Sequence, residues 1–111
     1  MTGETQTPAI IITAKYVHAA TDAAAFKVLA SRMAADAQRR PACIFLNAAE
    51  DVDCPSIFHL TEAWASESGF AEHASSEAFQ AVLKDALTLR ILQRSGTMFT
   101  VSGAQALEMP S

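Results

Sequence analysis

The sequence has few of the residues that build metal centres and disulfide frameworks. Its two cysteines, Cys43 and Cys54, stand eleven positions apart and belong to no CxxC or Cys/His ligand pattern. We therefore expect two free thiols and no bound metal. No low-complexity tract and no linker rich in proline or glycine interrupts the chain, which favours one domain.

Charge is also scarce and slightly negative. Only 18% of the residues are charged, and the net charge of -4 gives no broad positive field for nucleic acid or anionic lipid headgroups. No apolar run approaches the roughly 20 residues of a membrane-spanning helix. The opening MTGETQTP lacks the basic start and apolar stretch of a signal peptide. We therefore expect a cytoplasmic protein that binds neither nucleic acid nor membranes.

Apolar residues, in contrast, make up half of the 111 positions. A chain of this length forms one domain with a small core, so this share exceeds what the core can bury. Consecutive apolar residues at 10–12 and 44–46 fall in strand-like segments, which makes those strands apolar on both faces. Because the helices can cover only one face, we expect a second copy of the chain to cover the other, as a homodimer.

Four segments show the composition and alternation of strands, and three show helical spacing of apolar residues after a capping residue. The strands are expected at 9–18, 43–47, 56–64 and 97–102. The helices are expected to start at Thr21 or Asp22, at Ser66, and at Ser75 or Ser76, and Gly96 is expected to end the last one. That last helix carries an apolar stripe, which consists of Phe79, Val82, Leu83, Ala86 and Leu87.

The order β-α-β-β-α-α-β predicts a ferredoxin-like α+β fold, with a four-stranded antiparallel sheet and all helices on one face. The domain is expected to span residues 9–103, between an N-terminal tail at 1–8 and a C-terminal tail at 104–111. Strand alternation places His59 on the face opposite the helices, and hence at the dimer interface. His18 ends the first strand and is expected at the surface.

The segment PSIFHLTEAWASESGFAEH, at 55–73, combines a strand and a helix pattern with candidate chemical groups. Alternation places four side chains on one strand face: Phe58, Leu60, Glu62 and Trp64. We assign that face to the helices because it carries the larger apolar side chains. An unpaired carboxylate there costs on the order of several kcal/mol, so Glu62 needs a donor, and His73 is the nearest candidate in sequence.

Two interpretations of Glu62 and His73 stay open. Their contact would raise the pKa of the histidine while apolar walls raise that of the carboxyl, leaving a proton-transfer pair near neutral pH. The same contact would also serve as a buried structural tie between strand and helix.

The residues FHLTEAW at 58–64, followed by Phe70, His73, Ser76 and Phe79, resemble the signature of the antibiotic biosynthesis monooxygenase-like proteins. The sequence RPAC at 40–43 is similar to that family's EPGC, with alanine in the place of glycine. The resemblance implies a dimeric α+β barrel, in which two sheets pack together and each subunit keeps a pocket between its own sheet and helices. Across members it implies cofactor-free oxygenation of quinols or anthraquinones, haem degradation, or lactone isomerisation.

Two departures from the family's pattern reduce the number of activities that the resemblance implies. The haem-degrading members bind iron through a histidine at the position of Leu83, which disfavours a haem role. The anthraquinone-oxidising members carry an asparagine at the position of Leu60, so their substrate is not carried over directly. The resemblance then favours oxygenation of a quinol or related small aromatic compound by molecular oxygen, with no cofactor.

For this reaction the resemblance implies a base, a dry cavity and a flat slot for the aromatic ring. Glu62 or His73 would be the base. The substrate-binding residues would be Trp64, Phe70, Phe79 and Asn47. Trp64 would offer its N–H to a substrate oxygen, whereas the pattern leaves open which way Asn47 and Tyr16 face.

Two further functions fit the same residues. One is a dimeric protein that binds a small aromatic metabolite without turnover. The other is an isomerase of a small lactone, which needs an acid/base pair but no oxygen.

Overall fold

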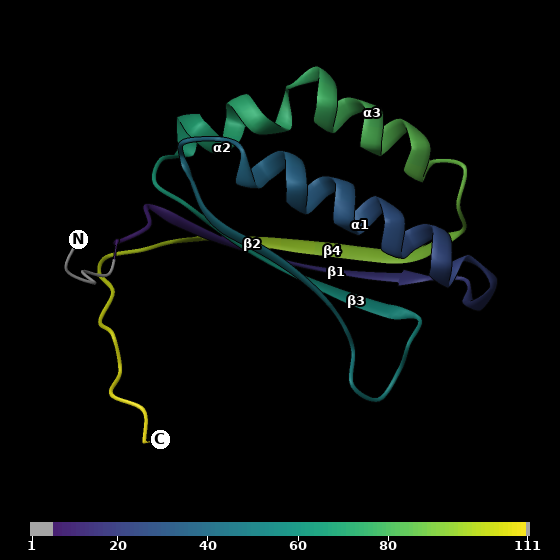
Figure 1. The fold of residues 1–111 in the computed structure, drawn as a ribbon, viewed down its shortest axis with the longest axis horizontal. Coiled ribbons are helices and arrows are strands. Elements are labelled where there is room, and N and C mark those ends of the chain that lie inside the picture. Colours follow the sequence, from purple (N-terminus) through teal and green to yellow (C-terminus); the bar gives the residue numbers. More distant parts are fainter. Residues whose placement is uncertain (1–5, 111) are drawn as a thin grey trace.

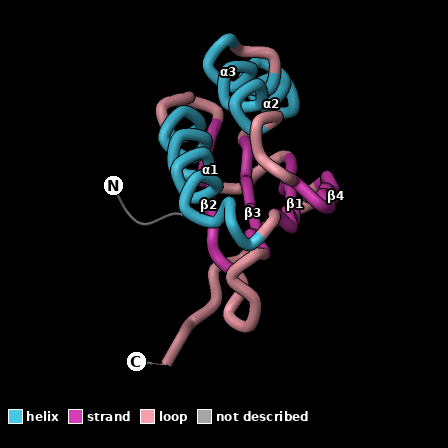
Figure 2. The backbone as a smooth tube through the Cα atoms, turned by 90° about the vertical axis from the view of Figure 1, so that its right-hand side faces the viewer, coloured by secondary structure: helices cyan, strands magenta, loops and turns pink. Residues whose placement is uncertain are grey.

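The computed structural model describes residues 6–110, and its centre is one four-stranded antiparallel sheet with helices on a single face (Figure 1). The elements in chain order are β1 (Ile10–His18), a short 3-10 turn η1 (Ala20–Asp22), α1 (Ala23–Gln38), β2 (Cys43–Glu50), β3 (Ile57–Trp64), α2 (Glu67–Ala74), α3 (Glu77–Ala86) and β4 (Ile91–Thr100). The strands lie in the order β2-β3-β1-β4, and each neighbouring pair is antiparallel. This confirms the predicted ferredoxin-like fold, and Figure 2 shows all three helices on the same side of the sheet.

The two short helices begin at the serines that the sequence indicated. The Ser66 hydroxyl accepts a hydrogen bond from the backbone N–H of Gly69, and that of Ser76 accepts one from Phe79. Each bond satisfies a backbone donor that the first helical turn leaves unpaired. Asp22 precedes α1 but makes no such cap; its carboxylate instead accepts a hydrogen bond from the backbone N–H of Arg90 at 2.8 Å. The start of α1 is thereby tied to the start of β4.

The core fills the space between the sheet and the helices. Its buried side chains come from three strands, α1 and α3: Ile10, Leu29, Met33, Ala37, Leu46, Leu60, Trp64 and Val82. A second buried cluster lies beside it and consists of Phe26, Ala30 and Phe58. Phe58, Leu60, Glu62 and Trp64 are all buried, as alternation along β3 predicts for the helix-facing side.

Two predicted boundaries are wrong in the C-terminal third. The last helix ends at Ala86, and β4 starts at Ile91 rather than at Thr97. Gly96, expected to end the helix, lies inside β4 opposite Ala14 of β1. The polar residues before Gly96 resemble a turn, but β4 is an edge strand, where side chains remain in water and only one side of the backbone needs a partner.

His18 is also placed differently from the expectation, because it is 1% exposed instead of lying at the surface. Its Nδ1 lies 2.8 Å from the carbonyl oxygen of Ala19, and its ring stacks on Phe26 at a centroid distance of 5.0 Å. His59 is exposed, as expected for the face without helices, and its Nε2 lies 2.8 Å from Oδ1 of Asp51.

The N-terminal segment joins the sheet at Pro8 and Ala9, whereas the C-terminal segment leaves it after β4. Residues 1–5 of the predicted N-terminal tail, and residue 111, lie outside the described residues. Pro8 is buried, and the backbone N–H of Ala9 donates to the carbonyl of Trp64. After β4, residues 101–110 leave the sheet as an extended, mostly exposed segment (Figure 1). Among the helices of residues 6–110, none has the length and apolar content required to cross a membrane.

Candidate functional site

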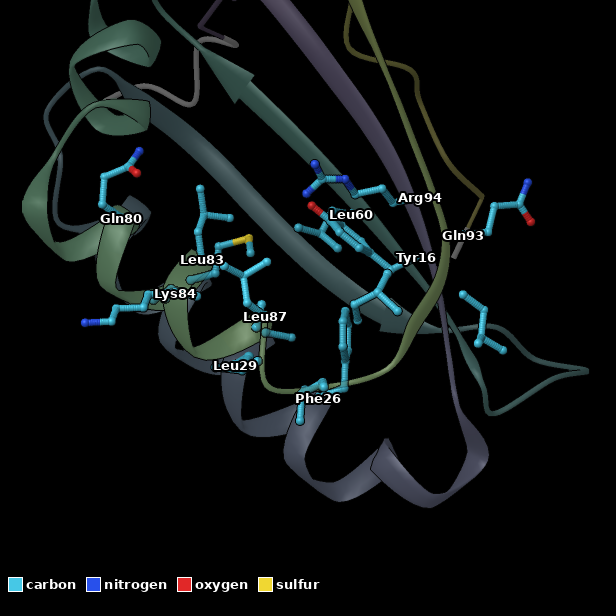
Figure 3. Close-up of a pocket in the computed structure, with 17 residues that line it drawn as sticks. Tyr16, Phe26, Leu29, Leu60, Gln80, Leu83, Lys84, Leu87, Gln93 and Arg94 are labelled. Atoms are coloured by element: carbon cyan, nitrogen blue, oxygen red, sulfur yellow. The ribbon is translucent and has the colours of Figure 1, made fainter.

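A cavity of about 700 Å³ lies between the sheet and the helices α1 and α3 (Figure 3). Its walls are mainly apolar, with Leu29 and Met33 from α1, Leu60 from β3 and Val82 from α3. Leu87 also borders the cavity and is 85% exposed, so it lies at an open rim. A concave, mostly apolar space of this size is typical of sites for small organic ligands.

Two polar side chains converge at one end of this cavity. Tyr16 of β1 and Arg94 of β4 are register partners, and Figure 3 shows their side chains running beside each other into the cavity. Burial raises the pKa of the Tyr16 phenol above its ordinary value, while the Arg94 charge acts in the opposite direction and the charge of Glu62 adds to the rise. Tyr16 therefore keeps its proton at neutral pH and acts as a hydrogen-bond donor.

Glu62 lies two residues beyond Leu60 on the same face of β3, just past the cavity floor. It is 8% exposed, and its Oε1 accepts a hydrogen bond of 3.0 Å from the indole N–H of Trp64. Burial raises the pKa of the Glu62 carboxyl, and the hydrogen bond from Trp64 offsets only part of that rise. Within residues 6–110 Oε2 has no hydrogen bond, so it is the oxygen left to accept a proton.

No hydrogen bond or ion pair joins His73 to Glu62, in contrast to the prediction. Its Nδ1 lies 3.1 Å from the Arg40 Nε, which donates to it, and 3.2 Å from Oδ2 of Asp36. These partners come from the end of α1 and the turn after it, more than thirty residues earlier in the chain. Burial lowers the pKa of His73, Asp36 opposes this effect and Arg40 adds to it, so the predicted rise in the histidine pKa is wrong.

Four of the predicted site residues form one aromatic cluster. The ring of His73 packs at a centroid distance of 5.0 Å from Trp64 and 4.8 Å from Phe79, and Trp64 meets Phe70 edge-on at 5.7 Å. This cluster lies outside the lining of the cavity. The Trp64 N–H is already used by Glu62, so it is not available to a substrate oxygen in this arrangement.

Asn47 lies apart from the other predicted site residues. It is exposed and pairs in register with Thr61, on the face of β2 opposite to that of buried Leu46. It borders a different groove, of about 500 Å³, together with Lys27 and Gln38.

Sequence reasoning left Tyr16 undecided and missed Arg94. Strand alternation from buried Ile10 would have placed Tyr16 on the helix-facing side. Arg94 could not be found in this way, because the strand that carries it was expected to begin only at Thr97. For metals, residues 6–110 contain no group of three or more His, Cys, Asp or Glu side chains close enough to bind an ion.

Comparisons with known proteins agree with the fold. The model of the family described as "Antibiotic biosynthesis monooxygenase" matches residues 9–85, which is well over half of the chain. A search of curated protein sequences gives no match.

Solved structures similar to this chain include a candidate antibiotic biosynthesis monooxygenase from Deinococcus radiodurans, with a TM-score of 0.83 and 18% identity over 90% of this chain and 99% of that one. Rv0793 from Mycobacterium tuberculosis has a TM-score of 0.78 and 15% identity over 87% and 98%. SnoaB, a cofactor-independent oxygenase from Streptomyces nogalater, in its N63A variant, has a TM-score of 0.74 and 14% identity over 90% and 97%. At these identities the solved structures establish only a shared fold. The match to the family model over residues 9–85 shows that the chain belongs to the antibiotic biosynthesis monooxygenase family.

Proposed function

We propose that the protein is a monooxygenase that oxidises a quinol or a related small hydroxylated aromatic compound without a bound cofactor. The observation that carries the proposal is the cavity of about 700 Å³, with Tyr16 and Arg94 at one end and Glu62 beyond its floor, in a chain of this family. The structurally similar SnoaB is described as a cofactor-independent oxygenase, which supports the same chemistry.

The reaction needs no redox group from the protein, because the substrate supplies the electrons. A hydroquinone loses a proton to a base, and its anion passes an electron to oxygen. The two radicals combine at a ring carbon, and loss of water leaves a hydroxyquinone. In sum, one hydroquinone and one O₂ give one hydroxyquinone and one water, so one oxygen atom enters the product and the other leaves as water.

Glu62 is the base in this proposal. Burial raises the pKa of its carboxyl, which makes the carboxylate a stronger proton acceptor than one in water. Trp64 holds Oε1, so Oε2 takes the proton. Tyr16 and Arg94 act as donors to the oxygen of the ionised ring, where they stabilise the negative charge that develops during the reaction.

The aromatic cluster of Trp64, Phe70, His73 and Phe79 has a positioning role in this proposal. His73 packs on the indole ring that holds Glu62, and its own Nδ1 is fixed by Arg40 and Asp36. An indole ring that His73 holds in place keeps its hydrogen bond to Oε1, and hence the carboxylate, in one orientation, and such orientation contributes to proton-transfer rates.

Oxygen uptake tests the proposal. Wild-type protein, mixed with a panel of naphthohydroquinones, is expected to consume oxygen above the rate of autoxidation and to form the hydroxyquinone. Glu62→Gln is expected to reduce kcat by about 100-fold or more. Glu67→Gln is the matched control, because Glu67 is an exposed carboxylate in the first turn of α2. A Glu62→Gln protein that remains folded and consumes oxygen at the wild-type rate would rule Glu62 out as the base.

A second candidate is a protein that binds an aromatic metabolite without turnover. The observation that favours it is that Glu62 and the aromatic cluster lie outside the lining of the cavity. This candidate predicts that ligands raise the melting temperature of the protein while oxygen uptake stays at the autoxidation rate across the whole panel. Hydroxyquinone formation by wild-type protein would exclude it.

The proposal includes a homodimer formed through the sheet face that the helices leave uncovered. On that face Phe45, Ala63, Ile11 and Phe99 are successive register partners across all four strands. Phe45 and Phe99 are 38% and 50% exposed in the single chain. Light scattering at micromolar concentration is expected to give the mass of two chains, and Phe99→Glu is expected to shift it toward one. A wild-type mass of one chain would refute the dimer.

A further inference from the structure

The charged side chains that border the cavity are all positive. Lys84 and Arg94 contribute to its lining, and among residues 6–110 no Asp or Glu side chain does. The chain as a whole has a net charge of -4, so the charge at the cavity is opposite in sign to that of the whole chain. Figure 3 shows Arg94 directed into the cavity beside Tyr16, whereas Lys84 extends away from it.

Arg94 also differs from the three arginines at 32, 39 and 40, because each of those pairs with an acidic side chain. Arg32 pairs with Asp85 at 2.6 Å, and Arg39 and Arg40 both pair with Asp36, at 3.1 and 3.3 Å. In the part of the chain from 6 to 110, no carboxylate pairs with Arg94. Arg94 is exposed in the single chain, so its guanidinium is solvated and free to pair with the anionic group of a ligand in the cavity that it borders.

The Arg94 and Tyr16 side chains at this end of the cavity are mainly hydrogen-bond donors and provide few acceptors. The guanidinium of Arg94 has five N–H donors in a planar fork and no acceptor, and the Tyr16 phenol retains its O–H. Such a fork matches the two oxygens of a carboxylate. A neutral hydroquinone presents two O–H groups with a pKa near 10, as for a free phenol, so it enters the cavity without charge.

We infer that the substrate is a hydroxylated aromatic acid, whose carboxylate binds to the guanidinium of Arg94 while the Tyr16 hydroxyl donates to its ring oxygen and its ring lies along the apolar walls. This inference rests on the proposed function and names the substrate class for the same cavity. It makes Arg94 the residue that selects between acidic and neutral aromatic substrates.

Binding of two matched ligands, 1-hydroxy-2-naphthoate and 1-naphthol, tests the inference. They differ only in the carboxylate, and calorimetry under nitrogen measures binding without any oxygenation. For wild-type protein the Kd of the naphthoate is expected to be at least about tenfold below that of naphthol, since a charge-assisted hydrogen bond is worth about that factor or more. Arg94→Gln is expected to abolish the preference, because it raises the Kd of the naphthoate far more than the Kd of naphthol.

Two further variants separate a specific contact from long-range charge. Arg94→Lys is expected to retain part of the preference, because it keeps the charge but loses the fork. Arg90→Gln removes the same charge from an exposed residue outside the cavity lining and is expected to retain the full preference. Thermal melting checks that each variant is folded.

Equal Kd values for the two ligands with wild-type protein would overturn the inference. An equal loss of affinity for both ligands in Arg94→Gln would also overturn it. Because these measurements involve no turnover, they succeed or fail independently of the oxygen-uptake test. If wild-type protein prefers the naphthoate but never consumes oxygen, the preference for acidic ligands stands as a binding property. The proposed monooxygenase activity is then excluded.

Discussion

The indole N–H of Trp64 donates a hydrogen bond to Oε1 of Glu62 across 3.0 Å, and both side chains are buried on the helix-facing side of β3. This bond uses the only donor of the tryptophan side chain. It also fixes one oxygen of a carboxyl whose pKa is raised by burial. The geometry of these two residues therefore leaves Oε2 as the carboxyl oxygen that can take up a proton.

The raised pKa of Glu62 predicts a specific pH dependence of stability. The folded protein holds the Glu62 proton more tightly than the unfolded chain, so the contribution of Glu62 to stability is lost as the pH rises from about 4.5, the ordinary value, through the higher folded pKa. Glu62→Gln keeps the acceptor for Trp64 and has no proton to lose. The unfolding free energy of this variant, relative to wild type, is expected to increase with pH in this window.

Urea unfolding of both proteins between about pH 4 and about pH 8 measures this difference. The comparison isolates Glu62, because all other titrating groups are shared. A difference that stays constant with pH, or that falls as the pH rises, would show that the pKa of Glu62 is not raised in the folded protein.

Gly69 in α2 is predicted to be intolerant of a side chain. A Cβ at this position would overlap the Cβ of Ala42 and come close to Oγ of Ser66, which caps the helix. An alanine normally favours a helix over glycine by about 1 kcal/mol, but overlap in a packed site costs about 1–3 kcal/mol. Gly69→Ala is therefore expected to lower the unfolding free energy.

The matched test is the double variant Ala42→Gly with Gly69→Ala, which moves the methyl group from one side of the contact to the other. It is expected to recover most of the stability that Gly69→Ala loses, measured by urea unfolding in a double-mutant cycle. Additive effects of the two substitutions would show that the two positions do not compete for the same space.

Arg40 and Arg39 both bind Asp36 but are predicted to differ in their contribution to stability. The Arg40 side chain is 26% exposed and also donates to His73, whereas that of Arg39 is 76% exposed. Arg40→Ala is expected to cost about 1–3 kcal/mol, since it leaves two buried groups short of a partner. Arg39→Ala is expected to cost less than about 1 kcal/mol, as is typical of an exposed ion pair.

A histidine titration by NMR gives a second measure for Arg40→Ala. The charge of Arg40 lowers the pKa of His73, and Asp36 raises it. Removing Arg40 is therefore expected to raise the pKa of His73 above the wild-type value. An unchanged histidine pKa, together with equal costs for the two alanine variants, would contradict the assigned contacts.

Val82 of α3 and Leu87, which follows the end of that helix, are predicted to contribute very differently to stability. Val82 is 3% exposed and belongs to the core, whereas Leu87 is 85% exposed at the rim of the cavity. Val82→Ala is expected to cost about 1.5–3 kcal/mol through lost burial and a new void. Leu87→Ala is expected to change stability by less than about 0.5 kcal/mol. Thermal or urea unfolding measures both costs. Equal costs for the two variants would contradict the position of α3 over the sheet.

Local patterns in the sequence were sufficient for most of the fold. Alternation along β3 placed Phe58, Leu60, Glu62 and Trp64 on the helix-facing side, where all four are buried. Ser66 and Ser76 marked the helix starts because a capping hydroxyl acts on a backbone N–H only three residues away. These signals depend on neighbours within one turn or one strand, so a single sequence contains them.

Most of the errors involve contacts between distant segments. The first half of β4 exists because it pairs with β1, about eighty residues earlier, and its polar residues give no local sign of a strand. The partners of His73 come from the end of α1, so sequence proximity suggested Glu62 instead. The pairing of Tyr16 with Arg94 depends on the same β1–β4 register, which is why the sequence did not reveal this part of the cavity.

The account depends most on the claim that small aromatic compounds bind in the cavity between α3 and the sheet. An NMR titration of isotope-labelled protein with 1-naphthol under nitrogen tests this directly. The account predicts that the largest amide shift changes occur around Tyr16, Leu60, Val82 and Arg94, which border the cavity. Changes centred instead on the groove of Lys27, Gln38 and Asn47, or no changes at millimolar ligand, would contradict it.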